Sequence, residues 1–231
     1  MRDPIVESIL KRPLTSHDQL VFLHLQKTAG MTLHAVLDSH YSAKQICPIM
    51  YQIDFMEHTP DELERYALLH GHFFHGIASR LLRGHPVYMT FLRDPVERAL
   101  SQYAHMQTRQ VDPPHAYGVG MDLETFVFHP NASKHITNLQ TRLLGARFSL
   151  DSMDEIMDAL EAEELLVHMG KGTTAAEAIE VLESMAYVGL TEQFDDSMAL
   201  LTYTFGWPPI KEVTSRNIGT GKPVRERIPP D

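Results

Sequence analysis

A lysine and two threonines surround a glycine directly after the first strongly apolar segment of the chain. The turn reads Gln26-Lys27-Thr28-Ala29-Gly30-Met31-Thr32. A tight turn between a strand and a helix is an anion site, because backbone N–H groups and the positive end of the helix dipole face the ligand. Lys27 adds a full positive charge, and Thr28 and Thr32 add hydroxyl donors. The segment therefore predicts a loop that holds a phosphate group.

The order of residues in this loop differs from that of a Walker phosphate loop. A Walker loop has the pattern GxxxxGK[ST], whereas here Lys27 precedes Gly30 and the leading glycine is absent. No strand ends in a clear acidic residue that would hold Mg²⁺. The loop thus indicates a phosphate ligand but argues against ordinary ATP chemistry. The alternative interpretation of so short a segment is a helix cap with a surface lysine.

A second candidate anion site follows another apolar segment. Arg93 ends that segment, and Asp94 and Pro95 open a helical pattern. Asp94 suits an N-cap and Glu97 a capping box, so both acids are interpreted as structural. Arg93 and Ser101, two helical turns apart, lie on roughly one face. A guanidinium grips phosphate oxygens as a fork, which favours a terminal phosphate here, the alternative being an arginine paired with a nearby acid.

Two histidines in the segment His70-Gly71-His72 form a candidate general base. Residues two apart in a strand point to the same face, so both imidazoles are expected to face one side of the sheet. Histidine is a common general base because its pKa lies near neutrality. With His75 these residues could hold a metal, but no carboxylate or cysteine completes a recognisable set, so no metal is predicted. His24 is interpreted as a hydrogen-bonded structural residue.

The elements that must position these residues are short apolar strands that alternate with helical patterns. Continuous apolar runs are typical of strands buried on both faces of a parallel sheet. The predicted strands are Gln19–Leu25 and Pro86–Leu92, with weaker ones at Tyr66–His70 and Ala186–Leu190. Helical patterns cover Leu33–Tyr41, Val96–Tyr103, Ala132–Leu144, Ser152–Val167, Thr174–Met185 and Glu192–Phe205. The alternation predicts an α/β fold in which helices flank a central parallel sheet in three layers.

The length of 231 residues suits one domain, and we expect a single domain over residues 1–231. Residues 1–19 are expected to be a peripheral N-terminal segment. Residues 109–121 are rich in proline and glycine and are predicted to form a loop, with a lid as the functional interpretation. Residues 208–231 are predicted to form a tail, which is either a disordered end or a strap across the site.

The composition of the chain restricts which partners it can bind and in which cellular compartment it is expected. The formal net charge is −10, which argues against nucleic acid as a partner because polyanion binding depends on neutralising phosphates. The single cysteine, Cys47, excludes an internal disulfide and favours a reducing, cytoplasmic setting. No apolar run is long enough to span a bilayer, and the start lacks the apolar core of a signal peptide. We therefore expect a soluble chain, unless an anchor has been removed, and leave its oligomeric state open.

The two anion motifs together resemble those of the membrane-associated, carbohydrate-type sulfotransferases. LHLQKTAGMTL resembles their 5′-phosphosulfate loop, often FLHxPKTAGTT, and FLRDPVERALSQY resembles their 3′-phosphate segment. NLQTRLLG at 138–145 and VGLTEQFDDSMALL at 188–201 are similar to other stretches common in that family. The resemblance is scattered from about Val21 to the tail. It implies a P-loop-like three-layer fold and a single sulfotransferase domain that uses 3′-phosphoadenosine 5′-phosphosulfate (PAPS) as donor without a metal.

The resemblance also implies which residues bind the nucleotide. The residues around the 5′-phosphosulfate would be Lys27, Thr28, Ala29, Gly30, Met31 and Thr32, and those at the 3′-phosphate Arg93 and Ser101. A basic loop that closes over the nucleotide in the family is loosely similar to residues 216–222, which suggests Arg216 and Lys222. Gln26 replaces a usual proline, and Met31 replaces a usual small hydroxyl residue. The second departure removes one possible donor to the ligand.

The catalytic residues implied by the resemblance are His72, Lys27 and His70. Hexuronyl 2-O-sulfotransferases of the family take their base from the second histidine of a similar HGH segment, which favours His72 with His70 as a supporting or substitute residue. Lys27 suits stabilisation of charge on the leaving phosphate. The acceptor is expected to be a hydroxyl on a carbohydrate or another small molecule. A neutral or weakly charged acceptor is favoured, because a net charge of −10 repels a polyanion.

Two other classes of function remain open. A P-loop-type nucleotide kinase would show Mg²⁺-dependent turnover of ATP, although the order of residues in the loop argues against it. A noncatalytic protein that binds the nucleotide as a sensor or scaffold would bind adenosine 3′,5′-bisphosphate without sulfating any acceptor. The presence of both Lys27 and the HGH pair argues against the second class.

Overall fold

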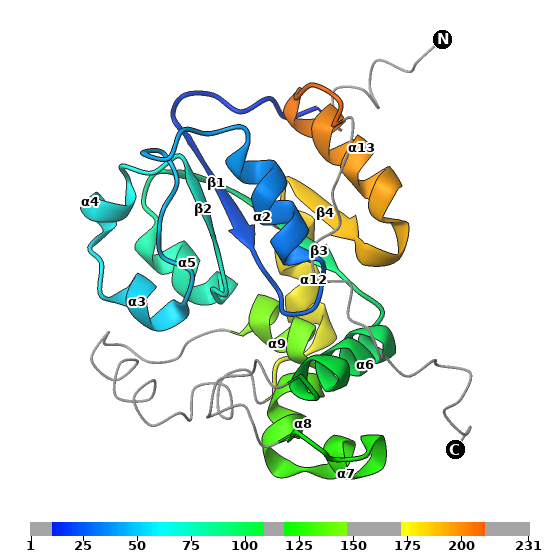
Figure 1. Cartoon of the computed structure of the whole chain (residues 1–231). Helices are drawn as coiled ribbons and strands as arrows, with labels where there is room; N and C mark the ends of the chain where they lie inside the picture. The colour runs from blue at the N-terminus through cyan, green and yellow to red at the C-terminus, as the bar shows by residue number, and fades with distance from the viewer. Residues whose placement is uncertain (1–10, 109–117, 147–171, 211–231) are drawn as a thin grey trace.

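The computed structural model describes residues 11–108, 118–146 and 172–210 (Figure 1). A central sheet of parallel strands runs through this part of the chain. Its members are β1 (Asp18–Leu23), β2 (Leu68–Gly71), β3 (His85–Leu92) and β4 (Tyr187–Leu190), in the spatial order β2-β1-β3-β4. The predicted parallel sheet is therefore confirmed, with each predicted strand shifted by a few residues at its ends.

Helices cover both faces of the sheet, as the three-layer prediction requires. One face carries α2 (Gly30–Asp38) and α13 (Phe194–Phe205), and the other carries α3 (Gln52–Met56), α4 (Pro60–Leu63), α5 (His75–Leu81), α9 (Leu139–Gly145) and α12 (Ala175–Ser184). The alternation of side chains along β1 divides the core between them. Leu20 and Phe22 pack with α2 and α13, whereas Val21 and Leu23 pack with the opposite layer.

The remaining described helices form a small extension at one end of the sheet. These are α6 (Pro95–Met106), α7 (Leu123–Phe128) and α8 (Pro130–Ile136), grouped near α9 in Figure 1. Met106, Phe126 and Ala132 make their shared apolar cluster. A 3₁₀ turn, η2 (Thr191–Gln193), joins β4 to α13.

The predicted helix Ala132–Leu144 is wrong, because two helices occupy that stretch. Asn138 has a left-handed backbone, with φ of 46°, and separates α8 from α9. Arg98, only 1% exposed, stabilises the break by donating from Nη2 to the carbonyl oxygens of His135 and Ile136 at 2.8 and 3.0 Å. The bend aims α9 at the end of β3, where one of its side chains contacts Arg93.

Several predictions fall wholly or partly outside the described residues. These are the helix Ser152–Val167, most of the loop 109–121, the tail beyond Ile210, and the two basic residues Arg216 and Lys222. The described end of that loop is tied to α6, since Gln107 hydrogen-bonds Gly118, Gly120 and Met121. The single-domain assignment stays a prediction. Among the residues that the structure describes, no helix is long and apolar enough to cross a membrane.

The described part of the predicted N-terminal segment, which begins at residue 11, contacts the core. The backbone N–H of Arg12 donates to the carbonyl of Thr204 in α13 at 2.7 Å, and Leu14 packs against the core beside α2 and α13. The segment therefore braces the face of the sheet that carries the phosphate-loop helix.

The order of the strands brings the two candidate anion motifs together. The chain leaves β1 toward β2 on one side and returns to β3 on the other side of β1. Open α/β sheets bind ligands at the carboxyl ends of strands at such a switch point. The loop containing Lys27 follows β1 and Arg93 follows β3, so both lie at this edge.

Candidate active site

The loop after β1 has an unusual backbone. Lys27 and Ala29 are both left-handed, with φ of 69° and 64°. Such residues cost about 1–3 kcal/mol each and tend to persist where function requires the conformation. Turns of this type point successive N–H groups into one concavity, which suits an anion. The Thr28 hydroxyl donates to the carbonyl of Leu25 at 2.8 Å, so this hydroxyl holds the loop together.

Helix α2 begins without a cap. Its N-cap residue, Ala29, has no side-chain hydrogen bond to the helix, and the first turn contains no acidic residue. The contrast with α6 is informative, since there the Asp94 side chain accepts from Val96 and Glu97 at 3.0 and 2.9 Å. A helix start that lacks a cap leaves its N–H groups and its positive dipole end for an anion.

Two positively charged and partly buried side chains, Lys27 and Arg93, lie at this loop. Burial, and to a lesser extent the nearby Arg93, lowers the pKa of Lys27. Thr32 is buried, whereas Met31 is exposed beside it. Two cations held this close repel each other, and an anion between them would remove the repulsion.

Arg93 connects the second motif directly to the first. Its Nη1 donates to the carbonyl oxygen of Lys27 at 3.0 Å. Gln140 of α9 holds the Arg93 backbone on both sides, accepting from its N–H at 2.9 Å and donating to its carbonyl at 2.8 Å. The guanidinium is loosely paired, since Glu97 and Glu192 each lie 3.9 Å away, and its buried Nε makes no hydrogen bond in the described part of the chain.

The N-cap prediction for Asp94 is confirmed, with a partner that the sequence did not indicate. In the predicted capping box, the backbone N–H of Asp94 would donate to the side chain of Glu97. In the structure this N–H donates to the Glu192 carboxylate at 3.0 Å. Ser101 lies two turns further along α6 and is half-buried. Gln140 and Glu192 belong to the stretches 138–145 and 188–201, whose roles were unassigned, and both position the segment around Arg93.

Four imidazoles contact one another in a row beside the loop, two pairs with tilted rings and the central pair, His34 and His24, edge to face. Ring centroids are separated by 4.1 Å between His70 and His34, 4.8 Å between His34 and His24, and 4.3 Å between His24 and His72. The row continues the alternation of β2, which ends at Gly71, because His72 directly after the strand lies in the same row as His70. His34 comes from α2, so the row links the HGH segment to the phosphate-loop helix.

His72 is held as a neutral imidazole with one nitrogen available. Its Nδ1 is 2.7 Å from the carbonyl oxygen of His24, which can only accept, so Nδ1 carries the proton and Nε2 keeps a lone pair. Burial lowers the pKa of His72, and the bond to the carbonyl partly opposes this. Tyr51 lies next to it, with ring centroids 5.9 Å apart, and 62% of the Tyr51 surface is exposed.

His70 is enclosed and already paired. Its Nε2 lies 2.8 Å from Oδ1 of Asp38, and the residue is only 6% exposed. Its Nδ1 is buried without a hydrogen-bond partner among the described residues. This geometry fits a supporting residue better than a base that must reach an acceptor. The sequence analysis did not identify Asp38, which lies 32 residues away in the chain.

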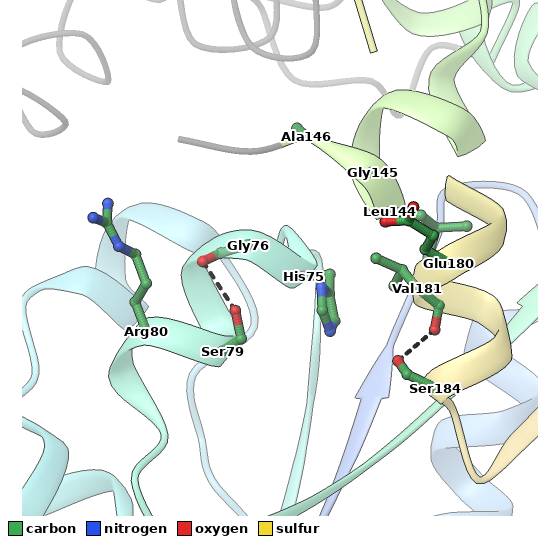
Figure 2. Close-up of a pocket in the computed structure, with 10 residues that line it drawn as sticks. All are labelled: His75, Gly76, Ser79, Arg80, Leu144, Gly145, Ala146, Glu180, Val181 and Ser184. Carbon is green, nitrogen blue, oxygen red and sulfur yellow. Dashed lines mark hydrogen bonds between the residues drawn. The ribbon is translucent and has the colours of Figure 1, made fainter. Parts of the chain in front are cut away.

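No group of three or more histidine, cysteine or acidic residues in the described ranges is arranged to hold a metal ion. His75 lies apart from the row, with its ring 4.9 Å from that of Tyr88. It lines a cavity of about 420 Å³ between α5, α9 and α12, on the other face of the sheet (Figure 2). Ser79 and Ser184 in this cavity hydrogen-bond to their own helices. No residue of the phosphate loop and none of residues 93–101 lines it.

The order of the parallel strands defines a P-loop-like α/β fold, and the uncapped start of α2 and the arginine after β3 make a candidate anion site at its ligand edge. No protein-family model matches the chain. Over 98 residues, which are 42% of the chain, it is 34% identical to a protein-tyrosine sulfotransferase from Arabidopsis thaliana. The matched region is 19% of that protein, so the chain spans about a fifth of its length. The similarity supports a sulfotransferase family, but neither the carbohydrate type nor the hexuronyl 2-O type.

Proposed function

We propose that this chain is a sulfotransferase that moves a sulfuryl group from PAPS to a hydroxyl of an acceptor. The observation that carries the proposal is the contact between the two anion motifs, in which Arg93 donates to the carbonyl of Lys27 beside an uncapped helix start. A loop for one phosphate and an arginine for another suit a nucleotide with phosphates at two positions. The partial similarity to a sulfotransferase supports the same reaction.

In the proposed reaction the acceptor oxygen attacks sulfur in line with the departing phosphate. The bond from sulfur to the bridging oxygen breaks, the bond from sulfur to the acceptor oxygen forms, and adenosine 3′,5′-bisphosphate leaves. Nε2 of His72 takes the proton of the hydroxyl. Lys27 compensates the negative charge that grows on the leaving oxygen, as preorganised cations do in transition states. PAPS supplies the activated sulfuryl group, and the chain supplies the base and the charges.

The fit of the chain to PAPS depends on its cations and its loop. The backbone N–H groups of residues 27–31 would hold the 5′-phosphosulfate, while the N–H of Thr32 donates to the carbonyl of Ala29 at 3.1 Å. Arg93 and Ser101 would hold the 3′-phosphate. The loosely paired guanidinium of Arg93 supports this assignment, because its buried Nε lacks a hydrogen-bond acceptor in the described part of the chain.

The first test compares two nucleotides. Adenosine 3′,5′-bisphosphate should raise the melting temperature more than adenosine 5′-monophosphate, because a ligand that binds only the folded state stabilises it and the second phosphate adds contacts with Arg93. Thermal unfolding with each nucleotide measures this. Arg93→Ala should remove most of the difference, whereas Arg83→Ala, an exposed arginine before the other end of β3, should preserve it. Equal shifts in the unmodified protein would contradict the 3′-phosphate assignment.

The proposed acceptor carries its hydroxyl on a ring. The matched relative is by its name a protein-tyrosine sulfotransferase, and the HGH resemblance favours a sugar. Both acceptors present a ring face. The exposed Tyr51 ring beside His72 supports this class, since a rigid aromatic surface can stack on a phenol or a sugar. Turnover of a tyrosine peptide, a simple glycoside and an open-chain polyol distinguishes a phenol acceptor, a sugar acceptor and an acceptor without a ring.

Tyr51→Ser should raise the KM for a ring acceptor about 3- to 10-fold, the usual value of an aromatic contact, and leave the melting shift with bisphosphate unchanged. Tyr51→Phe keeps the ring and should behave like the unmodified protein. Phe128→Ser on α7, which removes an even more exposed aromatic ring, is the control for loss of surface apolar area. A KM unchanged in Tyr51→Ser would remove this ring from acceptor binding.

A further inference from the structure

His24 lies between the two halves of the candidate site. It directly follows β1 and is 7% exposed. Its N–H donates to the carbonyl of Gly71 at 2.9 Å, and its carbonyl accepts from Nδ1 of His72 at 2.7 Å. The backbone of His24 therefore holds the HGH segment at two points. The expectation of a side chain satisfied by hydrogen bonds is wrong, because Nδ1 of His24 is buried without a partner among the described residues.

The His24 ring occupies the space where a side chain at position 30 would lie. A Cβ added to Gly30 would come within 1.8 Å of Nε2 of His24, and the next nearest atoms, at 2.0 and 2.3 Å, also belong to this ring. Gly30 does not have a left-handed backbone, so its conformation does not itself require glycine. The ring of His24 leaves no room for a side chain at residue 30. The imidazole packs directly against the first residue of α2.

The other side of the His24 ring contacts the candidate base. Its centroid lies 4.3 Å from that of His72, with the ring planes inclined by 31°. Burial, and then the neighbouring His72, His34, His70 and Lys27, hold the pKa of His24 well below its ordinary value. The ring is therefore neutral at physiological pH and acts by packing rather than by charge.

From these contacts we propose that His24 is a positioning residue that couples the phosphate loop to His72. The inference rests on the proposed function, because it takes the loop as the donor site and His72 as the base. Removing the ring leaves a void that both neighbours can enter, so the loop and the base would lose their fixed positions together. A misplacement of about 1 Å can reduce turnover by about 10²-fold even when the reacting groups are intact.

Bisphosphate affinity and the titration of His72 test the coupling without a known acceptor. In His24→Ala we expect adenosine 3′,5′-bisphosphate to bind about 5- to 150-fold more weakly, the usual range of coupling between sites. The pKa of His72, followed by NMR, should rise toward that of free histidine, because water enters the vacated space and burial is what lowers it. Circular dichroism and melting temperature report whether the variant is folded.

His34→Ala is the matched control. His34 is an equally buried imidazole in the same row, and its ring contacts are with His24, His70 and Phe22 rather than with His72. Its loss should destabilise the fold to a similar extent while changing bisphosphate affinity and the His72 titration much less. Equal effects in both variants would show general loosening of the row and overturn the specific role of His24.

A double substitution gives the sharpest test. Gly30→Ala alone should lower the melting temperature and weaken bisphosphate binding, because the new Cβ meets the His24 ring. Adding His24→Ala opens that space, so the double variant should be more stable and bind better than Gly30→Ala. A double variant no better than Gly30→Ala would overturn the inference. If the unmodified protein binds no bisphosphate, the proposed function fails, while the melting temperatures and the His72 titration still decide the role of His24.

Discussion

Replacement of His72 by alanine should lower turnover by about 10²–10⁴-fold, the usual contribution of a general base. The reason is geometric, since the carbonyl of His24 fixes the proton on Nδ1 and leaves the lone pair on Nε2. Bisphosphate affinity should change little, because the base contacts the acceptor and not the phosphates. Steady-state rates with labelled PAPS, together with bisphosphate affinity as a folding control, measure the effect.

The pH dependence of the same reaction gives an independent check on the base. Burial holds the pKa of His72 below the ordinary value of 6.5, so the neutral, basic form is present at pH 7. Activity should therefore be retained as the pH falls to 6.5 and be lost only at lower pH, when His72 becomes protonated. An acid limb at or above pH 6.5 would contradict the assignment.

His70→Ala separates the two histidines of the HGH segment. His70 is bound to Asp38 and enclosed, so its loss should cost less turnover than the loss of His72 and act through the row of rings. Collapse of activity in His70→Ala with near-normal turnover in His72→Ala would move the role to His70. Near-normal turnover in both would exclude the pair and direct the search to His75, His105 and Asp112, the one acidic residue of the 109–121 loop.

The sheet could be predicted because its strands carry continuous apolar runs, of which Val21, Phe22 and Leu23 in β1 are fully buried. The short helices α3, α4 and α5 could not, since five or so residues give no clear helical period. The predicted helix over residues 132–144 is interrupted at Asn138, whose left-handed backbone separates α8 from α9. The buried Arg98 of α6 binds the carbonyl oxygens at the end of α8, a contact between distant residues that no helical pattern contains.

The residues of the candidate site likewise fall into those that the sequence predicts and those that only the structure shows. Lys27, Arg93 and the HGH pair were identified because each lies at or shortly after the carboxyl end of a strand, so local order places it at the ligand edge of a parallel sheet. Their partners lie far along the chain. Gln140 is 47 residues from Arg93, and Glu192 is 98 residues from Asp94, and no periodicity connects residues at such separations. His24 was interpreted as a hydrogen-bonded structural residue, and only the folded structure shows its ring in the space that a side chain at residue 30 would need.

Replacement of Lys27 by alanine should lower turnover by about 10²–10³-fold, the usual cost of removing one group that stabilises transition-state charge. The charge on the leaving oxygen grows toward the transition state, so the ammonium matters most there and less in the ground state. Arg93 and the backbone N–H groups of the loop remain to bind bisphosphate. Affinity for bisphosphate should therefore fall by much less than the rate constant, and single-turnover rates beside titration calorimetry separate the two.

The stability of the same variant distinguishes a functional lysine from a structural one. Burial and the nearby Arg93 both lower the pKa of Lys27, which means that the folded protein disfavours the charge there. Removing the ammonium should consequently leave the melting temperature of the ligand-free protein unchanged or raise it. Lys27→Arg keeps the positive charge but replaces the compact ammonium by a planar guanidinium. This variant should bind bisphosphate well and recover only part of the turnover rate. Unchanged turnover in Lys27→Ala would exclude this residue from the chemistry, and a large loss of stability would instead assign it to the fold.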